Sequence, residues 1–466
     1  MIYQHYRAYD SAVWKRKPRR LRHFIILSQP LDEMDVVQTN MTRNGYYPDC
    51  WQVFSRNKTT MVLSIWRKGF GIKYQIQQGD MLDEMTTYMA KSGLNPVMFA
   101  SKPRKFSREN KSYWIVWRGK EFSWKNEQIP KVYETFSRDW DDVESLIESH
   151  MRKYELPSIN IFVSKSGHTL LSAAYGYSDL LNKKRASPNN RYRIASISKT
   201  LTAMAIANLI SQGKLSMRTL VFGKRGILNT FEVHPFLQQI TVSHLLEHSS
   251  GGWSHLLQRE FDRMETSQME FLEFLIKSYV PIYVPGQVFV YSNIGYVFLG
   301  RIIEKVSGES YEDFVRHNLL WPLNIDARVG GSISGKDEVM YYSHDNANPY
   351  DHWNPSLLDS AAGWVFQAED LAKLYKHLES GRNAEHVILA LRNRLSAGHG
   401  LGIQIDSTGA LYHLGSLTGV EAIAYTHNDL QVIIFTNERD RQHNVHTGWM
   451  LLLSQHISRI VDLGLI

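Results

Sequence analysis

A serine followed three residues later by a lysine, Ser196 and Lys199, carries side chains that together could perform nucleophilic chemistry. Apolar residues recur at helical spacing after the lysine and Gly213 is a typical helix end, so the sequence predicts a helix that opens near Ser196. Residues three apart lie on one helical face, which puts the lysine amine beside the serine hydroxyl. A lysine partly removed from water can lose its proton and act as a base, and the unpaired N–H groups of a first turn favour developing negative charge.

The same spacing also occurs at Ser55 with Lys58 and at Ser211 with Lys214. Taken alone, it is more typical of a serine in a helix cap with a solvated lysine. Other stretches of the chain have to distinguish the two interpretations.

Two such stretches supply groups that a serine nucleophile needs. Tyr291 and Asn293 stand at the start of a predicted helix, after an extended segment, so both side chains can project into a cleft. A tyrosine near a lysine can lower its proton affinity and carry protons to a leaving group, and the amide can hold a substrate carbonyl. In a predicted strand, His413 is followed by Gly415, which allows close approach to the backbone, and by Ser416. The N–H groups of Ser416 and Ser196 could then form an oxyanion hole.

In this order the three stretches resemble the S-x-x-K, Y-x-N and K/H-x-G motifs of the serine β-lactamase and penicillin-binding-protein superfamily, over roughly residues 138 to 466. Further matches are Arg193-Ile194-Ala195, Leu245 to Gly251, and Tyr291 to Tyr296. The resemblance implies an α+β fold, an antiparallel sheet flanked by helices, with a helical subdomain and the site between them. It implies catalytic roles for Ser196, Lys199 and Tyr291, and substrate binding by Asn293, His413, Gly415 and Ser416.

One position departs from the pattern of β-lactamases and transpeptidases, which carry lysine where this chain has His413. The H-x-G form resembles the class C-like branch of esterases, D-aminopeptidases and polyglycine hydrolases. A histidine is mostly neutral at pH 7 and anchors a carboxylate less firmly than lysine, which weakens the case for antibiotic hydrolysis. The resemblance makes His248 part of a structural turn and not a base.

The elements around these residues also indicate α+β architecture. A helix over 141–153 and a hairpin over 159–176 precede the Ser196 helix, and four short strands between 402 and 435 precede a last helix over 447–461. That helix is expected to cover one face of an antiparallel sheet. We find no glycine-rich phosphate loop and no metal-ligand spacing, so neither a cofactor nor a metal is predicted.

The first 130 residues contain an internal repeat of about 50 residues. Each copy has an amphipathic helix, a turn at Gly45 to Pro48 or Gly93 to Pro96, and a tryptophan-bearing strand at Trp66 or Trp117. The tryptophans are interpreted as core residues of small helix-plus-sheet units. The repeat resembles those in front of the catalytic domain of polyglycine hydrolase-like proteins. We therefore expect a repeat region over 1–137 and a β-lactamase-like hydrolase domain over 138–466.

Composition is that of a globular protein, with 43% hydrophobic and 21% charged residues among 466. Its single cysteine, Cys50, excludes an intrachain disulfide. Residues 1–140 hold 24 Lys and Arg against 13 Asp and Glu, and the rest of the chain carries a net −4. The basic part predicts contact with anionic surfaces or glycans, and nucleic acid is not an expected partner. No stretch is apolar enough to span a membrane, and no secretory segment is visible, so the chain as written predicts a cytoplasmic protein and an incomplete N-terminus would predict a secreted one.

The expected activity is that of a serine hydrolase acting through an acyl-enzyme, most simply on a peptide or amide bond, as in polyglycine hydrolases. A carboxylesterase or D-aminopeptidase of the same fold is the first alternative. An alternative of another class is a non-catalytic scaffold whose basic repeats bind a partner. The presence of Ser196, Lys199 and Tyr291 together argues against the scaffold.

Overall fold

A computed structural model divides the chain into two compact units, Met1–Glu121 and Phe122–Ile466. The structure describes backbone strands in the first unit and, from residue 124, all residues except 125–126, 181, 231–232, 253–267, 279–281, 332–333, 336, 344–354, 381–398 and 440–444. Each unit is described by itself.

The first unit contains two three-stranded antiparallel sheets of the same strand order, β1-β3-β2 and β4-β6-β5. The strands are β1 (Phe24–Pro30), β2 (Tyr46–Arg56), β3 (Thr59–Lys68), β4 (Tyr74–Gly79), β5 (Asn95–Ser101) and β6 (Tyr113–Arg118). In both sheets a proline pairs with the predicted strand tryptophan, Pro48 with Trp66 and Pro96 with Trp117, and the register shifts just after it. The helices expected to open each copy lie outside the described residues, and the repeat stays a prediction.

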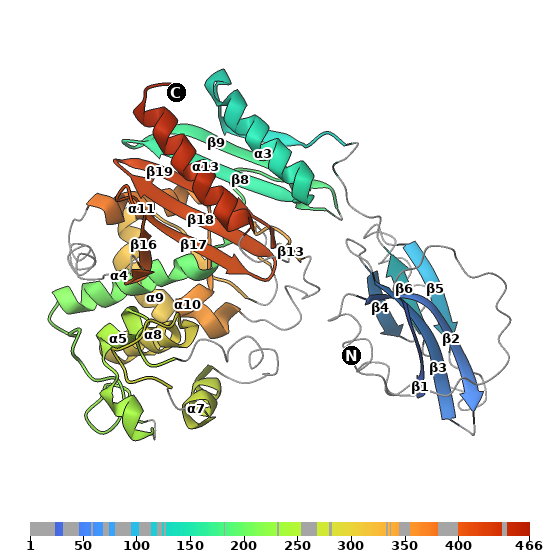
Figure 1. The fold of residues 1–466 in the computed structure, drawn as a ribbon, viewed down its shortest axis with the longest axis horizontal. Helices are drawn as coiled ribbons and strands as arrows, with labels where there is room; N and C mark the ends of the chain where they lie inside the picture. Colours follow the sequence, from blue (N-terminus) through green and yellow to red (C-terminus); the bar gives the residue numbers. More distant parts are fainter. Residues whose placement is uncertain are drawn as a thin grey trace. The chain divides into compact units, whose positions relative to one another are not determined.

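The second unit is built on a nine-stranded antiparallel sheet (Figure 1). Its order is β10-β9-β8-β19-β18-β17-β16-β15, and β7 also pairs with β9. The strands are β7 (Lys131–Thr135), β8 (Ser158–Lys165), β9 (His168–Asp179), β10 (Lys184–Arg185), β15 (His399–Gly400), β16 (Ile403–Ile405), β17 (Leu411–Leu417), β18 (Val420–His427) and β19 (Leu430–Thr436). The predicted hairpin is β8 with β9, and its turn uses left-handed backbone at Ser166 (φ 52°) and Gly167 (φ 87°).

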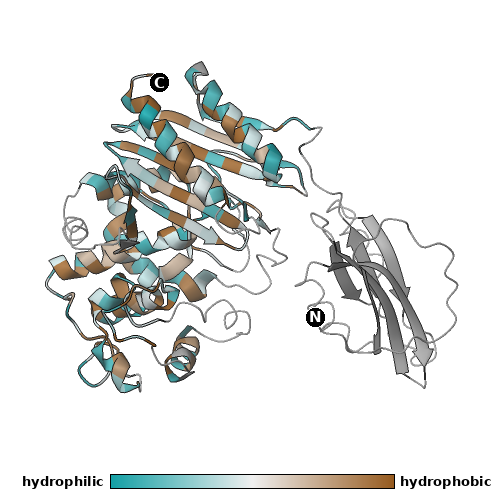
Figure 2. Cartoon of the chain, in the orientation of Figure 1, coloured by the Kyte–Doolittle hydropathy of each residue, from teal (hydrophilic) through white to brown (hydrophobic). Residues whose placement is uncertain are grey.

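Helices cover both faces of this sheet, as Figure 1 shows. On one face lie α3 (Asp141–Tyr154) and the C-terminal α13 (Val445–Asp462), and α11 (Ala368–Ser380) packs on the other. Because the central strands β8 and β19 are covered on both sides, nearly all of their residues are buried. In Figure 2, α3 and α13 carry both hydrophobic and hydrophilic residues, as expected of helices with one buried side. The predicted antiparallel sheet flanked by helices is confirmed.

Beyond α11 lies a mostly helical part that contains α4 and α8, and its apolar core is continuous with the face of the sheet that α11 covers. Its helices are α4 (Ser198–Ser211), α5 (Val242–Leu246), α7 (Gln268–Ser278), α8 (Asn293–Ser307), α9 (Tyr311–Val315) and the short α10 (Asp359–Ala362). Short 3-10 or π turns are η2 (Arg138–Trp140), η3 (Ala195–Ile197), η4 (Pro235–Gln239), η5 (Arg316–Leu320), η6 (Trp321–Leu323) and η7 (Pro355–Leu358). Small strand pairs complete the unit: β11 (Tyr192–Arg193), β12 (Arg328–Val329) and β14 (Trp364–Phe366) form one sheet, and β13 (Tyr342–Ser343) pairs with β20 (Glu438–Arg439).

The division between the two units lies earlier than the predicted boundary at 137/138. Strand β7 pairs with β9, so it belongs to the large sheet. Trp124 has no exposed surface, and its indole N–H donates to the carbonyl of Leu156 at 2.8 Å. Both features were missed because this segment is short and does not alternate between polar and apolar residues. Among the described residues, no helix combines the length and apolarity needed to cross a membrane.

Candidate active site

Ser196 lies in the tight turn η3, directly before α4. The predicted helix therefore starts two residues after the serine and not at it. The preceding residue, Ala195, adopts a left-handed conformation with φ 48°, which is uncommon for a residue with a Cβ. The turn is held by the Ile194 N–H, which donates to the carbonyl of Trp364 on β14 at 3.0 Å. Ser196 is half-buried, so its hydroxyl is within reach of a bound molecule.

Lys199, one turn further along, has no exposed surface. Its Nζ lies 3.1 Å from Ser196 Oγ, 2.7 Å from Asn293 Oδ1 and 2.8 Å from the carbonyl oxygen of Ala361. Burial lowers the pKa of Lys199 well below the ordinary lysine value, because the charged form loses its hydration. No carboxylate is among these contacts, so the site favours the neutral amine, which is the form that can accept a proton.

Tyr291 approaches the same two side chains from the segment before α8. The Lys199 Nζ lies 4.8 Å from the centre of its ring, and Ser196 is near enough to its hydroxyl to affect the pKa of Tyr291. Burial raises the pKa of Tyr291, so the phenol holds its proton at neutral pH. Asn293 is the first residue of α8, and the preceding Ser292 caps this helix by accepting from the N–H of Gly295 at 3.1 Å.

His248 contacts the segment that carries Tyr291 and Ser292. Its Nδ1 accepts from the N–H of Ser292 at 3.0 Å, and its ring stacks on Tyr291 with centroids 4.4 Å apart. An Nδ1 that accepts carries no proton, so the ring is held in one tautomer. His248 touches Tyr291 and not Ser196 in the described contacts, which agrees with its interpretation as a structural residue.

Strand β17 carries the remaining predicted residues, His413, Gly415 and Ser416. A Cβ added at Gly415 would lie 2.3 Å from the carbonyl oxygen of Ile194, so only glycine lets the strand pass this close to the serine turn. His413 is buried on the same face of the strand, and its Nδ1 donates to the carbonyl of Leu414 at 2.7 Å. In the neutral ring the Nε2 then bears a lone pair, which is unsuited to a carboxylate.

The structure thus brings Lys199 Nζ into contact with Ser196 and Asn293, places the Tyr291 ring beside it, and sets Gly415 of β17 against the turn before Ser196. The other predicted pairs lie elsewhere: Ser211 and Lys214 are exposed at the far end of α4, and Ser55 lies in the first unit.

Sequence reasoning missed the Ala361 carbonyl. A backbone oxygen leaves no side-chain motif, although the run Ser360-Ala361-Ala362-Gly363 consists of small residues that permit close packing.

Comparisons with known proteins agree with this geometry. A family model described as Beta-lactamase matches residues 143–456. Protein flp of Staphylococcus aureus is 30% identical over 183 residues, which cover 39% of this chain and 36% of that protein, so the match spans about a third of the relative's length.

Among solved structures, an octameric penicillin-binding protein homologue from Pyrococcus abyssi is similar with a TM-score of 0.55 and 27% identity, covering 64% of this chain and 73% of that one. The D-amino acid amidase of Ochrobactrum anthropi SV3 shares the fold, with a TM-score of 0.57 and 21% identity over 66% of this chain and 93% of the amidase. The family model covers the large sheet except β7, the helical part and all seven predicted site residues. The chain belongs to the beta-lactamase family.

Proposed function

We propose that this protein is a serine hydrolase that acts through an acyl-enzyme, with Ser196 as nucleophile. The observation that carries the proposal is the contact between Ser196 Oγ and the buried Lys199 Nζ, whose pKa is lowered by burial. A neutral amine at this distance can take the serine proton as the hydroxyl attacks a carbonyl carbon.

The neighbouring groups fit the later steps. The N–H groups of Ser196 and Ser416 are proposed to bind the oxyanion of the tetrahedral intermediate. Tyr291, protonated and with Lys199 Nζ 4.8 Å from its ring centre, is proposed to pass a proton to the leaving group, which departs as an amine or alcohol. Water then attacks the ester on Ser196, and the acid product leaves.

We propose a peptide or amide bond as the target. Strand β17 pairs with β18 along its whole length but with β16 only through Leu411 and Tyr412, so in the described residues the rest of its other edge has no partner strand. That edge begins next to the serine turn, and an extended peptide could add to it as a further strand. One similar structure is named an amidase and another a penicillin-binding protein homologue, and both names fit an amide bond as the target.

One feature of the site bears on the class of substrate. The tautomer of His413 does not favour a substrate carboxylate, which argues against the lysine-dependent chemistry of antibiotic hydrolysis. An ester would pass through the same steps and is the alternative substrate.

The basic first unit is proposed to hold an anionic surface or glycan near the catalytic unit.

Active-site labelling tests the proposal. A fluorophosphonate probe should modify Ser196 in the full-length protein, and Ser196→Ala should abolish the labelling. Ser211→Ala is the matched control and should label normally. Turnover is then compared on p-nitrophenyl esters, D-amino-acid anilides and glycine-rich peptides. Undiminished labelling of Ser196→Ala, or turnover of none of these substrates by the wild type, would contradict the proposal, and the latter result would favour a scaffold.

A further inference from the structure

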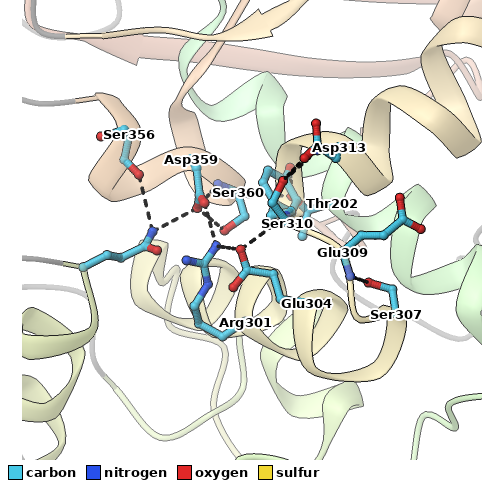
Figure 3. Close-up of polar contacts among 12 residues, drawn as sticks. Thr202, Arg301, Glu304, Ser307, Glu309, Ser310, Asp313, Ser356, Asp359 and Ser360 are labelled. Atoms are coloured by element: carbon cyan, nitrogen blue, oxygen red, sulfur yellow. Dashed lines mark hydrogen bonds and ion pairs between the residues drawn. The ribbon is translucent and has the colours of Figure 1, made fainter.

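Helix α10, which supplies the Ala361 carbonyl to Lys199, is tied to α8 by an ion pair between Asp359 and Arg301 (Figure 3). The Arg301 guanidinium lies 2.6 Å from Asp359 Oδ2, and only 10% of the arginine side chain and 13% of the aspartate side chain are exposed. The other carboxylate oxygen, Oδ1, accepts from the N–H and hydroxyl of Ser360 and from Gln268 Nε2 at 2.6, 2.8 and 3.1 Å. Every described polar partner of Asp359 thus fixes the first turn of α10.

Helix α10 and Trp364, the first residue of β14 after it, meet α4 at three points around the catalytic lysine. The Thr202 hydroxyl donates to the carbonyl of Ser360 at 2.6 Å, and Ser198 Oγ accepts from the N–H of Trp364 at 3.1 Å. Between them, the Lys199 amine donates to Ala361. A displacement of α10 would therefore move one of the three atoms that surround Lys199 Nζ.

Helices α8 and α10 also pack unusually closely beside the ion pair. A Cβ built on Gly300 would lie 2.3 Å from Ser360 Oγ and 2.7 Å from its Cβ. Glycine is unfavourable in a helix interior by about 1 kcal/mol relative to alanine, so its presence here serves the approach of α10.

Asn293 and Arg301 both belong to α8 and are eight residues apart, so a single rigid helix carries both side chains. Asn293 Oδ1 binds the lysine amine directly, whereas Arg301 holds the helix that offers Ala361. Helix α8 therefore positions both Asn293 Oδ1, which it carries, and the Ala361 carbonyl, whose helix it anchors.

We propose that Arg301 and Asp359 are positioning residues that aim the Lys199 lone pair at Ser196, an inference that rests on the hydrolase mechanism proposed above. A neutral amine has two N–H bonds and one lone pair. With the N–H bonds directed to Asn293 Oδ1 and the Ala361 carbonyl, the lone pair faces Ser196 Oγ. An α10 of only four residues, with no side-chain cap, cannot hold this geometry by itself, and the Arg301–Asp359 pair supplies the anchor.

The test uses full-length protein and the rate constant of Ser196 labelling by a fluorophosphonate. This rate constant describes each folded molecule, so a smaller folded fraction does not alter it. Asp359→Asn keeps the shape of the side chain, but its single amide oxygen can serve Arg301 or the Ser360 and Gln268 donors, not both. We expect labelling to slow by about 10- to 100-fold, the scale of a displaced catalytic group, with KM for a small ester nearly unchanged.

Three further variants separate positioning from general stability. Gly300→Ala, which pushes α10 away without touching charge, should slow labelling in the same way. Arg301→Lys should retain more of the rate than Arg301→Met, because it keeps a cation opposite Asp359. Glu304→Gln is the matched control: Glu304 also contacts Arg301, at 3.2 Å, but not α10, and the rate should stay at the wild-type value.

The dependence on pH distinguishes orientation from protonation. A misdirected but neutral lysine remains slow at alkaline pH, so the defect of Asp359→Asn should persist there. Wild-type rates in both Asp359→Asn and Gly300→Ala, or a defect that disappears at alkaline pH, would overturn the inference while leaving the hydrolase proposal intact. A wild-type protein that does not label at all would overturn both.

Discussion

Among the described residues no carboxylate partners the buried amine of Lys199, and this sets how activity should depend on pH. Because burial lowers its pKa, the amine becomes neutral well below the ordinary lysine range. Activity should therefore rise from acid pH and level off before about pH 10, where a solvated lysine would only begin to lose its proton. The pH profile of kcat/KM on a small ester measures this. A profile that rises only above that range would show that the buried amine is not the base.

Lys199→Met gives a second measure of the same group. Methionine has similar length and no charge to bury, so the folded state should be at least as stable as the wild type. Turnover should fall by about 10²-fold or more, the usual scale for a proton-transfer group. Lys214→Met is the matched control at the exposed Ser-x-x-Lys pair and should keep the wild-type rate. Equal rates in both variants would point to a different base.

His248 allows a test of structure against catalysis at a single residue. His248→Phe keeps a ring against Tyr291 but leaves the buried Ser292 N–H without its acceptor, which should cost about 1–3 kcal/mol of unfolding free energy. His248→Asn restores an acceptor and tolerates the left-handed backbone at φ 54°, so its loss in urea denaturation should be smaller. If His248→Asn were fully stable but inactive, the histidine would have a chemical role after all.

At the scale of elements, α3 and α13 meet through two buried histidines. His150 Nε2 lies 3.0 Å from His446 Nδ1, and the His150 ring stacks on Trp449 at 3.9 Å. Burial, with the neighbouring His446 and Lys153, lowers the pKa of His150 from 6.5 to about 3. At a pH between these two pKa values, His150 is protonated in the unfolded chain and neutral in the folded protein. The free energy of unfolding should then fall with falling pH, by up to about 1.4 kcal/mol per unit from this residue.

His150→Phe should flatten that dependence while keeping the stacking on Trp449. Urea denaturation at neutral pH and at about pH 5 measures the difference in slope. His168→Gln, at an exposed position of the β8–β9 hairpin, should keep the wild-type slope. An unchanged slope in His150→Phe would mean that other groups account for any sensitivity of the protein to acid.

Elements with a strong local pattern were predictable from the sequence. The β8–β9 hairpin, α3, α4, the C-terminal strands and α13 follow from apolar periodicity and turn residues, and the side chains of the site follow from motif spacing. Helix α10 and strand β7 did not, because four or five residues carry too little pattern and their placement depends on partners distant in sequence. The Ala361 carbonyl and the Arg301–Asp359 pair are contacts of this kind.

At the scale of the whole molecule, the boundary between the two units, after Glu121, determines where the chain can be truncated without loss of the catalytic unit. A protein beginning at Phe122 keeps β7 and Trp124, and it should fold and hydrolyse a small ester at the full-length rate. One beginning at residue 138 loses the β7 partner of β9 and the buried tryptophan, and should be less stable by at least about 3–5 kcal/mol, the scale of losing one large buried aromatic side chain. Chemical denaturation compares the two. Equal stabilities would mean that residues 122–137 do not contribute to the catalytic unit.

The charge of the first unit predicts what the shortened protein loses. Residues 1–121 carry a net +11 and the remainder −4. Removing the first unit should weaken turnover of a large anionic target and spare a small ester. The loss should shrink as salt rises, because exposed charges are screened beyond about 8–10 Å at physiological ionic strength. If the shortened protein is folded yet inactive on the small ester, the first unit contributes to the site itself.

The place of β19 in the middle of the sheet has a consequence for synthesis of the protein. Strand β8 leaves the ribosome early, but its partner β19, where Leu430 pairs with Lys165, emerges near the end of the chain. At a translation speed of about 5–20 residues per second, the open edge of β8 waits roughly 10–50 seconds for that partner. During this interval the nascent chain exposes an apolar strand of the kind that chaperones bind and that is prone to aggregate. The sheet that carries the site is therefore incomplete until β19 has been synthesised, and we expect no hydrolysis by chains that stop before it.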